Sequence, residues 1–397
     1  MMTWVQYQER EHPTARLPTG AIRILNVAYD ATFQQGPPGF KKGEAIISAS
    51  PEPSWIEEGE KFAIVGLNVQ VDARLGQVDL PGGLTVLRNV AFELPDHWRD
   101  WLGALRSEEV EECTLFLVAK MPAKNLNVVD ADDQLLQDRV AHWYGGLMLV
   151  TKFFQLNDPF LASGNRDRED VDVRHFQVLQ PPHKSIVDYY SPITRSELVR
   201  AALIGERLGS FQGPWRSDHW RLLRCLGIYQ AARCDRDILN RIHQFVRCIE
   251  GLIAPKKMGE IDAAGRRNRQ GTKAQFKRRT ELFVGVSHHE LMSDMYEVRG
   301  EIEHLHEYRF LEHYDRDERL RLAKLEAISE WIARDCLSRI LLDPALTAHF
   351  GSVVALDRFW AMDEPSRRAV WGAPIDPTIP ISSFRFDHVN DSELGVR

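Results

Sequence analysis

Cysteines and long apolar runs are scarce in this chain. Its 397 residues include only five cysteines, Cys113, Cys225, Cys234, Cys248 and Cys336, and no Cys-x-x-Cys pair. The odd number and the wide spacing argue against a disulfide framework or a zinc knuckle and favour reduced thiols in a cytosol. No apolar run reaches the roughly 18–20 residues of a membrane span. The opening residues, MMTWVQYQEREHP, lack the basic segment and apolar core of a secretion signal. We therefore expect a cytoplasmic protein without membrane contact.

Several motifs that would identify an enzyme class are also missing. The net charge is −7, so any surface for nucleic acid must be local. The segment QGPPGFKKGE (35–44) contains glycine and lysine but not in P-loop order, and no Rossmann, Gly-x-Ser-x-Gly or His-Glu-x-x-His pattern occurs. The 14 histidines show no standard metal-ligand spacing. We expect neither a metal nor a cofactor.

The hydrophobic pattern predicts an α+β multidomain protein. Residues 1–130 form a β-rich domain, with strands expected within 21–33, 61–75, 84–95 and 113–120 and a short helix at 97–105. Residues 131–190 form a connecting region. It has a helix over 132–156 that Asp132 or Asp133 can cap, an exposed polar loop over 162–175, and a short strand over 173–180.

The remaining chain is dominated by helical spacing. Residues 191–345 predict a helical bundle, which starts with a Thr-x-x-Glu capping box from Thr194 to Glu197. Further helices are expected over 220–254 (one helix, or two that meet near 234–237), 272–285, 291–307 and 316–342. A tail follows at 346–397, and its stretch 371–384 is too rich in proline to be helical.

The segment LMSDMYEVRGEIEHLHE (291–307) combines a packing stripe with groups suited to phosphate chemistry. The stripe consists of Leu291, Met295, Val298, Ile302 and Leu305, at spacings of three and four. Arg299 borders the stripe, and His304 follows five residues later, which is about 140° around an ideal helix. The two side chains can therefore reach one spot only if the helix ends or distorts, or if a second molecule completes the site.

An arginine and a histidine together could cleave RNA without metal. Guanidinium stays charged and matches two phosphate oxygens, whereas imidazole exchanges a proton near neutral pH. The histidine would take the proton of the 2′-OH or protonate the leaving 5′ oxygen, and the arginine would stabilise the charge on phosphorus. The products would be a 2′,3′-cyclic phosphate and a 5′-OH. Charged residues that merely flank a core stripe are the simpler interpretation of the same spacing.

Two phrases within 194–342 resemble the HEPN superfamily, specifically its Apea-like group. ILNRIHQFVRCIEGLI (238–253) resembles the family's "A-x-E-x-L-L" helix, with Glu250 at the acidic position. The 291–307 segment resembles "L-Y-x-x-R-(S/N)-x-I-x-H-G", with Tyr296, Arg299, Ile302 and His304 in register. TKAQFKRRTELFVG (272–285) is similar to the intervening helix. The chain departs from the family at Gly300, where a polar residue is usual, and at Leu305, where glycine is frequent.

The resemblance implies an all-α HEPN bundle that forms a homodimer and acts as an endoribonuclease in prokaryotic antiphage defence, that is, as an abortive-infection toxin. Arg299 and His304 would be catalytic, and Tyr296, Glu250 and His306 would support them. The substrate would be RNA, with tRNA among the candidates, and the N-terminal domain would respond to an unknown trigger. A catalytically inactive HEPN module for dimerisation and RNA or nucleotide binding is the alternative.

A basic stretch lies between the two resembling phrases. Residues 255–279 contain nine basic and two acidic side chains. One interpretation is a surface that follows an RNA backbone, and the other is a solvated loop between helices. The candidate RNA-binding residues are Lys256, Lys257, Arg266, Arg267, Arg269, Lys273, Lys277, Arg278 and Arg279.

Overall fold

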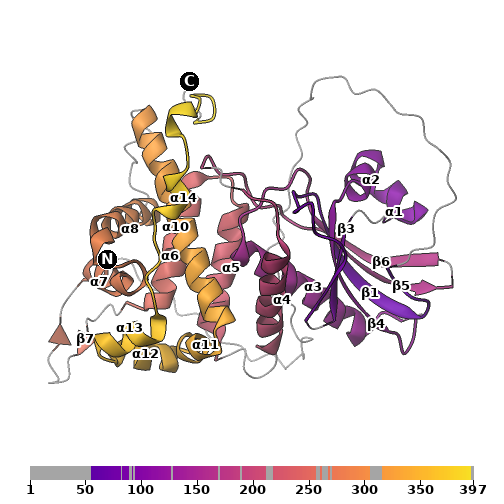
Figure 1. Ribbon diagram of the computed structural model, residues 1–397, viewed down its shortest axis with the longest axis horizontal. Coiled ribbons are helices and arrows are strands. Elements are labelled where there is room, and N and C mark those ends of the chain that lie inside the picture. Colours follow the sequence, from indigo (N-terminus) through magenta and orange to yellow (C-terminus); the bar gives the residue numbers. More distant parts are fainter. Residues whose placement is uncertain are drawn as a thin grey trace, which may run out of the picture. The chain divides into compact units, whose positions relative to one another are not determined.

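A six-stranded antiparallel sheet forms the first part of the structure, a computed structural model (Figure 1). The strand predicted at 21–33 lies outside the residues that the structure describes. These are residues 55–394 except 82, 89–91, 93, 127, 169, 188–189, 212–217, 256–259, 262–266, 269–270 and 305–314. The strand order is β2-β3-β4-β1-β5-β6. The strands are β1 (Glu60–Leu67), β2 (Val78–Leu80), β3 (Leu84–Arg88), β4 (Leu115–Pro122), β5 (Phe160–Asp167) and β6 (Asp170–Val178).

The central strand β1 is buried on both faces of the sheet. Ala63 and Val65 belong to one apolar core and Phe62 and Ile64 to another. This follows from the strand's period of two, which sends successive side chains to opposite faces. The predicted strands within 61–75, 84–95 and 113–120 are confirmed: the first two end earlier than their ranges, and the third is shifted by two residues toward the C-terminus.

Helices cover the two faces of the sheet. The helix α3 (Ala131–Val150) packs against β1, β4 and β5. On the other face, Trp98 of α1 (Asp96–Leu102) and Val110 of α2 (Ala104–Glu111) join the second core. The core beneath α3 continues without a break into the helices that follow.

The hairpin of β5 and β6 replaces the exposed loop that the sequence predicts over 162–175, and that prediction is wrong. Ser163 and Asn165 are polar yet buried. Gln137 of α3 donates a hydrogen bond to Ser163 Oγ at 2.8 Å, and Asn165 Nδ2 donates one to Leu126 O at 2.7 Å. Because these partners satisfy the polar groups, a strand of polar composition can face the interior.

A buried ion pair joins the sheet to the start of α3. Lys61 Nζ lies 2.9 Å from Asp130 Oδ1 and 2.7 Å from Asp133 Oδ2, and Lys61 is 0% exposed. Asp130 is also the N-cap of α3, in a capping box with Asp133. The helix therefore begins one residue earlier than predicted, and neither Asp132 nor Asp133 is its cap.

Replacing Lys61 with methionine should lower the free energy of unfolding by about 3–5 kcal/mol, because Asp133 would remain buried without a counter-ion. Urea denaturation measures this loss. Lys120→Met in the neighbouring strand is the matched control, since its 3.1 Å pair with Glu60 is partly exposed and should cost less than about 1 kcal/mol. Equal losses in the two variants would contradict a structural role for the buried pair.

The second part of the structure is helical. The capping box at its start is confirmed, since Glu197 N donates to Thr194 Oγ1 and Thr194 N donates to Glu197 Oε2. The break near residues 234–237 is also confirmed. The helices are α4 (Arg195–Ser210), α5 (Trp220–Cys234), α6 (Ile238–Ile253), α7 (Thr272–Val284), α8 (His289–Glu303) and α10 (Arg316–Leu342).

The apolar stripe of α6 lies at the centre of these helices. Ile242, Phe245, Val246 and Ile249 are fully buried, and α6 packs against α5, α7, α8 and α10. The spacing of three and four residues puts these side chains on one face, as predicted. The opposite face of α6 therefore remains available for polar groups.

Residues beyond α10 are also helical. The helices α11 (Pro344–Phe350), α12 (Val353–Ala361) and α13 (Glu364–Trp371) bring aromatic rings onto α7, where the Trp371 ring lies 4.5 Å from that of Phe283. The stretch 371–384, predicted to contain no helix, includes the four-residue α14 (Ile379–Ser382). Its proline lies in the first turn, where a missing N–H costs no helical hydrogen bond. No helix within the described ranges has both the length and the apolar character that a membrane span requires.

Candidate active site

Arg299 of α8 is held against α6. Its Nη2 donates a hydrogen bond to Glu250 Oε2 at 2.8 Å, and Nη1 pairs with Glu303 one turn later on α8. The guanidinium carbon lies 5.5 Å from the centre of the Tyr296 ring. The Arg299 side chain is only 13% exposed. Two carboxylates and an aromatic face therefore fix this guanidinium beside solvent.

Tyr296 connects α8 to α7. Its hydroxyl donates to Thr272 Oγ1 at 3.1 Å, and its ring centre lies 4.9 Å from that of Phe276. Glu250, Tyr296 and Arg299, all predicted site residues, are thus in contact. Tyr296 contacts Arg299 through its ring.

His304 lies at the point where α8 ends. The helix ends at Glu303, and His304 is its C-cap, with its backbone N–H donating to Gly300 O at 3.1 Å. Its side chain is exposed. Because the hydrogen bond to Gly300 spans four residues as in a helix, the backbone N–H of His304 keeps its helical position, and the chain leaves the helix only after it. His306 lies outside the described residues.

Two further residues of α6 share a helix face with Glu250, the partner of Arg299. His243, Arg247 and Glu250 follow one another at spacings of four and three, which puts them on one helix face. Glu250 stands at the acidic position of the phrase 238–253. The spacing of His243 and Arg247 from Glu250 was therefore a signal in the sequence that could have selected these two residues. Arg247 is exposed and has no ion-pair partner among the described residues.

The His243 ring is held in its neutral form. Its Nε2 is buried and makes no hydrogen bond in the described part of the chain. Burial, together with the positive charges of Arg247 and Arg299, lowers the pKa of His243 to about 4. The ring is therefore neutral at pH 7, but a pKa this far below 7 makes it a weak proton acceptor beside the cations.

The low pKa of His243 predicts a loss of stability in mild acid. Between pH 6.5 and about 4 the unfolded chain binds a proton at this residue that the folded chain does not bind, so the free energy of unfolding falls as the pH falls. The drop in Tm from pH 7 to pH 5 should be smaller in His243→Leu than in the wild type. His97→Leu, on an exposed site of α1, should leave the drop unchanged. A drop as large in His243→Leu as in the wild type would refute the assignment.

Only part of the predicted RNA-binding stretch is described. Lys256, Lys257, Arg266 and Arg269 lie outside the described residues, and Arg267 is described only through its backbone in β8 (Arg267–Asn268), which pairs with β7 (Glu260–Ile261). On α7, Lys273 pairs with Glu297 and Lys277 with Glu290 of α8, and Arg278 is exposed. These pairs reduce the positive charge that α7 presents to solvent.

Arg279 was predicted to be an exposed RNA-binding residue, and this prediction is wrong. It is buried and donates hydrogen bonds to the carbonyl oxygens of Ile253 and Ala254, at the end of α6. Its guanidinium carbon also lies 4.9 Å from the centre of the Trp360 ring. A cation at this position satisfies the free carbonyls of a helix C-terminus. Arg279 is therefore a structural cap and is not accessible to a phosphate backbone.

The arrangement provides groups for acid–base and phosphate chemistry. In the described part of the chain, no set of three or more His, Cys, Asp or Glu side chains is placed to hold a metal ion. A fixed guanidinium, an exposed guanidinium and two histidines lie on α6 and α8. Comparisons of the chain with family models, with curated proteins and with solved structures give no match.

Proposed function

We propose that this protein is a metal-independent endoribonuclease of the HEPN type. The observation that carries the proposal is the 2.8 Å contact of Arg299 with Glu250. It joins in space the two phrases, 238–253 and 291–307, that resemble the family in sequence. Arg299 would stabilise the charge that develops on phosphorus, and His304 would be the general acid or base.

The proposed reaction needs only groups of the protein and the RNA. A histidine takes the proton of the 2′-OH, the 2′ oxygen forms a bond to phosphorus, and the bond from phosphorus to the 5′ oxygen breaks. A protonated group then gives a proton to that 5′ oxygen. The exposed Arg247 adds a second guanidinium that can contact a neighbouring phosphate.

The biological setting of the proposal comes from the same resemblance. The enzyme would work in the cytoplasm as a homodimer in which two HEPN bundles bring their Arg299 and His304 side chains to one cleft. It would cleave RNA, tRNA among the candidates, during antiphage defence. The N-terminal part would restrain it until a trigger arrives.

A catalytically inactive HEPN module is the second candidate, and one observation favours it. Glu250 and Glu303 both pair with Arg299, so the two carboxylates neutralise the positive charge that would otherwise attract a phosphate. Gly300 also stands where the family usually has a polar side chain. A Cβ at Gly300 would meet no atom within 4 Å, so Gly300→Asn fits the structure. This variant should cleave RNA faster than the wild type if the missing side chain limits activity.

Incubation of the full chain with total RNA in EDTA separates the two functions. The proposal expects cleavage that continues when divalent metal is removed. Retention of RNA on the protein without any cleavage would favour the inactive module, and neither binding nor cleavage would exclude both.

A further inference from the structure

The three nitrogens of the Arg299 guanidinium lie in different surroundings. Nε is buried and makes no hydrogen bond within the described residues. Nη2 donates to Glu250 Oε2 at 2.8 Å, and the side chain of Glu250 is only 18% exposed. Nη1 pairs with Glu303, whose side chain is 39% exposed. A phosphate that arrives from solvent therefore reaches Arg299 at Nη1, and Glu303 already occupies that nitrogen.

Glu303 stands at an unfavourable place for a carboxylate. It is the last residue of α8, and the free carbonyl groups at the end of a helix carry partial negative charge. In its pair with Arg299 the acidic residue follows the basic one by four positions, which is the weaker of the two orders on a helix. The pair therefore adds little to the stability of α8, and the helix itself does not require a glutamate at this position.

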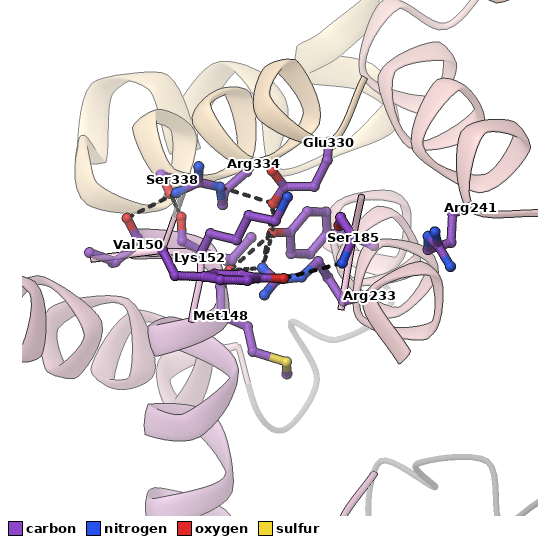
Figure 2. Close-up of polar contacts among 12 residues, drawn as sticks. Met148, Val150, Lys152, Ser185, Arg233, Arg241, Glu330, Arg334 and Ser338 are labelled. Carbon is purple, nitrogen blue, oxygen red and sulfur yellow. Dashed lines mark hydrogen bonds and ion pairs between the residues drawn. The ribbon is translucent and has the colours of Figure 1, made fainter. Parts of the chain in front are cut away.

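The pair of Arg299 and Glu303 differs from the buried ion pairs of this protein. In Figure 2 the side chains of Arg233 and Arg334 are directed toward Glu330, which is 1% exposed. Breaking a buried pair leaves a charge in the interior without a partner and is strongly destabilising, whereas a pair that reaches solvent contributes little. An anion from solvent can therefore displace Glu303 from Arg299 at low cost.

The proposed general acid or base follows Glu303 directly in the chain. This residue, His304, is exposed at the end of α8. A phosphate that contacts Nη1 of Arg299 within reach of His304 has to come to the place of the Glu303 carboxylate. Two anions at one guanidinium nitrogen repel each other. RNA binding at Arg299 therefore requires Glu303 to move away.

We propose that Glu303 is an autoinhibitory carboxylate, which holds Nη1 of Arg299 in the RNA-free protein and leaves it when an RNA phosphate binds. Glu250 stays on Nη2 and positions the guanidinium. This inference rests on the proposed function, which assigns the phosphate to Arg299. It gives the two carboxylates opposite roles, since Glu250 holds the cation in place and Glu303 competes with the substrate for it.

The two roles have different kinetic signatures. Removal of a competing group strengthens the binding of the substrate and of the transition state alike. Glu303→Gln, which keeps the shape of the side chain and removes its charge, should therefore lower KM about two- to fivefold and leave kcat within about twofold. Glu250→Gln loosens the cation, so it should lower kcat instead.

Binding of an RNA that cannot be cleaved tests the inference separately from the reaction. A fluorescent oligonucleotide with 2′-O-methyl groups keeps its phosphates but lacks the attacking hydroxyl. Its anisotropy is followed as the full chain is added in EDTA. Glu303→Gln should bind this RNA about two- to fivefold more tightly than the wild type. The Tm of the variant should stay close to that of the wild type, because the lost pair reaches solvent.

Glu301→Gln is the matched control. It removes the same charge from the same helix two residues earlier, where the side chain points to a different side and has no ion pair among the described residues. This variant should bind RNA as the wild type does. Equal gains with Glu301→Gln and Glu303→Gln would show that general charge attraction is responsible and would overturn the inference. An unchanged or weaker affinity of Glu303→Gln would overturn it as well.

A double-mutant cycle tests whether Glu303 acts through Arg299. In Arg299→Ala, the additional Glu303→Gln exchange should not strengthen RNA binding, and a gain of the same size as in the wild type would overturn the inference. RNA cleavage by the wild type without any gain in Glu303→Gln would refute the inference and retain the proposed function. A gain in binding without cleavage by any variant would refute the proposed function alone. No RNA binding by the wild type or by Glu303→Gln would refute both.

Discussion

Replacement of Arg299 by alanine is expected to lower the rate of RNA cleavage in EDTA by a factor of about 10²–10³, because the charge on phosphorus would lose its fixed cation. Replacement of His304 by alanine should lower the rate by about 10²–10⁴, the usual contribution of a general acid or base. Arg299→Lys should recover little of the activity, since an ammonium group keeps the charge but not the planar fork. Initial rates on a labelled RNA measure all three effects.

Control variants separate loss of chemistry from loss of folding. Arg224→Ala removes an exposed arginine of α5, and His97→Ala removes an exposed histidine of α1. Both should cleave RNA at the wild-type rate. The Tm of His304→Ala should stay close to that of the wild type because His304 is exposed. Arg299→Ala removes a side chain that is only 13% exposed and pairs with Glu250 and Glu303, so its Tm should fall, and its cleavage rate is measured well below that Tm. Wild-type cleavage by Arg299→Ala would contradict its assigned role.

The same assay decides which histidine moves the proton. The proposal gives this role to His304, which is exposed at the end of α8. His243 shares a helix face with Glu250, the partner of Arg299, and has a buried, unpaired Nε2. If His243→Asn abolished cleavage while His304→Ala preserved it, the general base would lie on α6 instead.

The Glu330→Gln variant is expected to lose about 3–5 kcal/mol of stability at pH 7. Glu330 is 1% exposed and accepts a 2.7 Å hydrogen bond from Tyr229, in addition to its ion pairs with Arg233 and Arg334. Glutamine preserves the shape but leaves two buried guanidinium groups without their counter-ion. Guanidinium chloride denaturation measures the loss. Glu364→Gln is the control, because its pair with Arg368 is exposed and should contribute about 0.5 kcal/mol or less.

Glu330 also predicts a dependence of stability on pH. Burial alone would raise its pKa, but Arg334, Arg233, Lys152 and the Tyr229 hydrogen bond outweigh burial and lower the pKa to about 2. Its contribution is complete above the unfolded value of 4.5 and is lost as the pH falls toward 2. The shift corresponds to about 3 kcal/mol. The wild type should therefore lose more stability than Glu330→Gln between pH 5 and pH 2, and parallel curves would contradict the assignment.

Elements whose sequence signals lie within one short segment were predicted correctly. The capping box of Thr194 and Glu197 and the apolar stripe of α6 depend on spacing within one helix, and both appear as predicted. The strand β5 was missed because Ser163 and Asn165 look exposed in the sequence. Their hydrogen-bond partners, Gln137 and the Leu126 carbonyl, are far away in the chain.

In the candidate site, too, the sequence predicted the residues that lie in short recognisable phrases and missed those that depend on packing between helices. Glu250, Tyr296 and Arg299 were predicted from short phrases, and the structure brings them into contact. His243 and Arg247 were missed because their importance depends on how α6 packs against α8. The buried charges near Lys152 and Glu330 come from separate helices, so no single stretch of sequence indicates that they meet.

The chemistry of the RNA ends tests the central claim most directly. An RNA oligonucleotide cleaved by the full chain in EDTA would be analysed by mass spectrometry. The account predicts one product with a 2′,3′-cyclic phosphate and another with a 5′-OH, and neither product with Arg299→Ala. Products with a 5′-phosphate, or intact RNA with the wild-type protein, would contradict it.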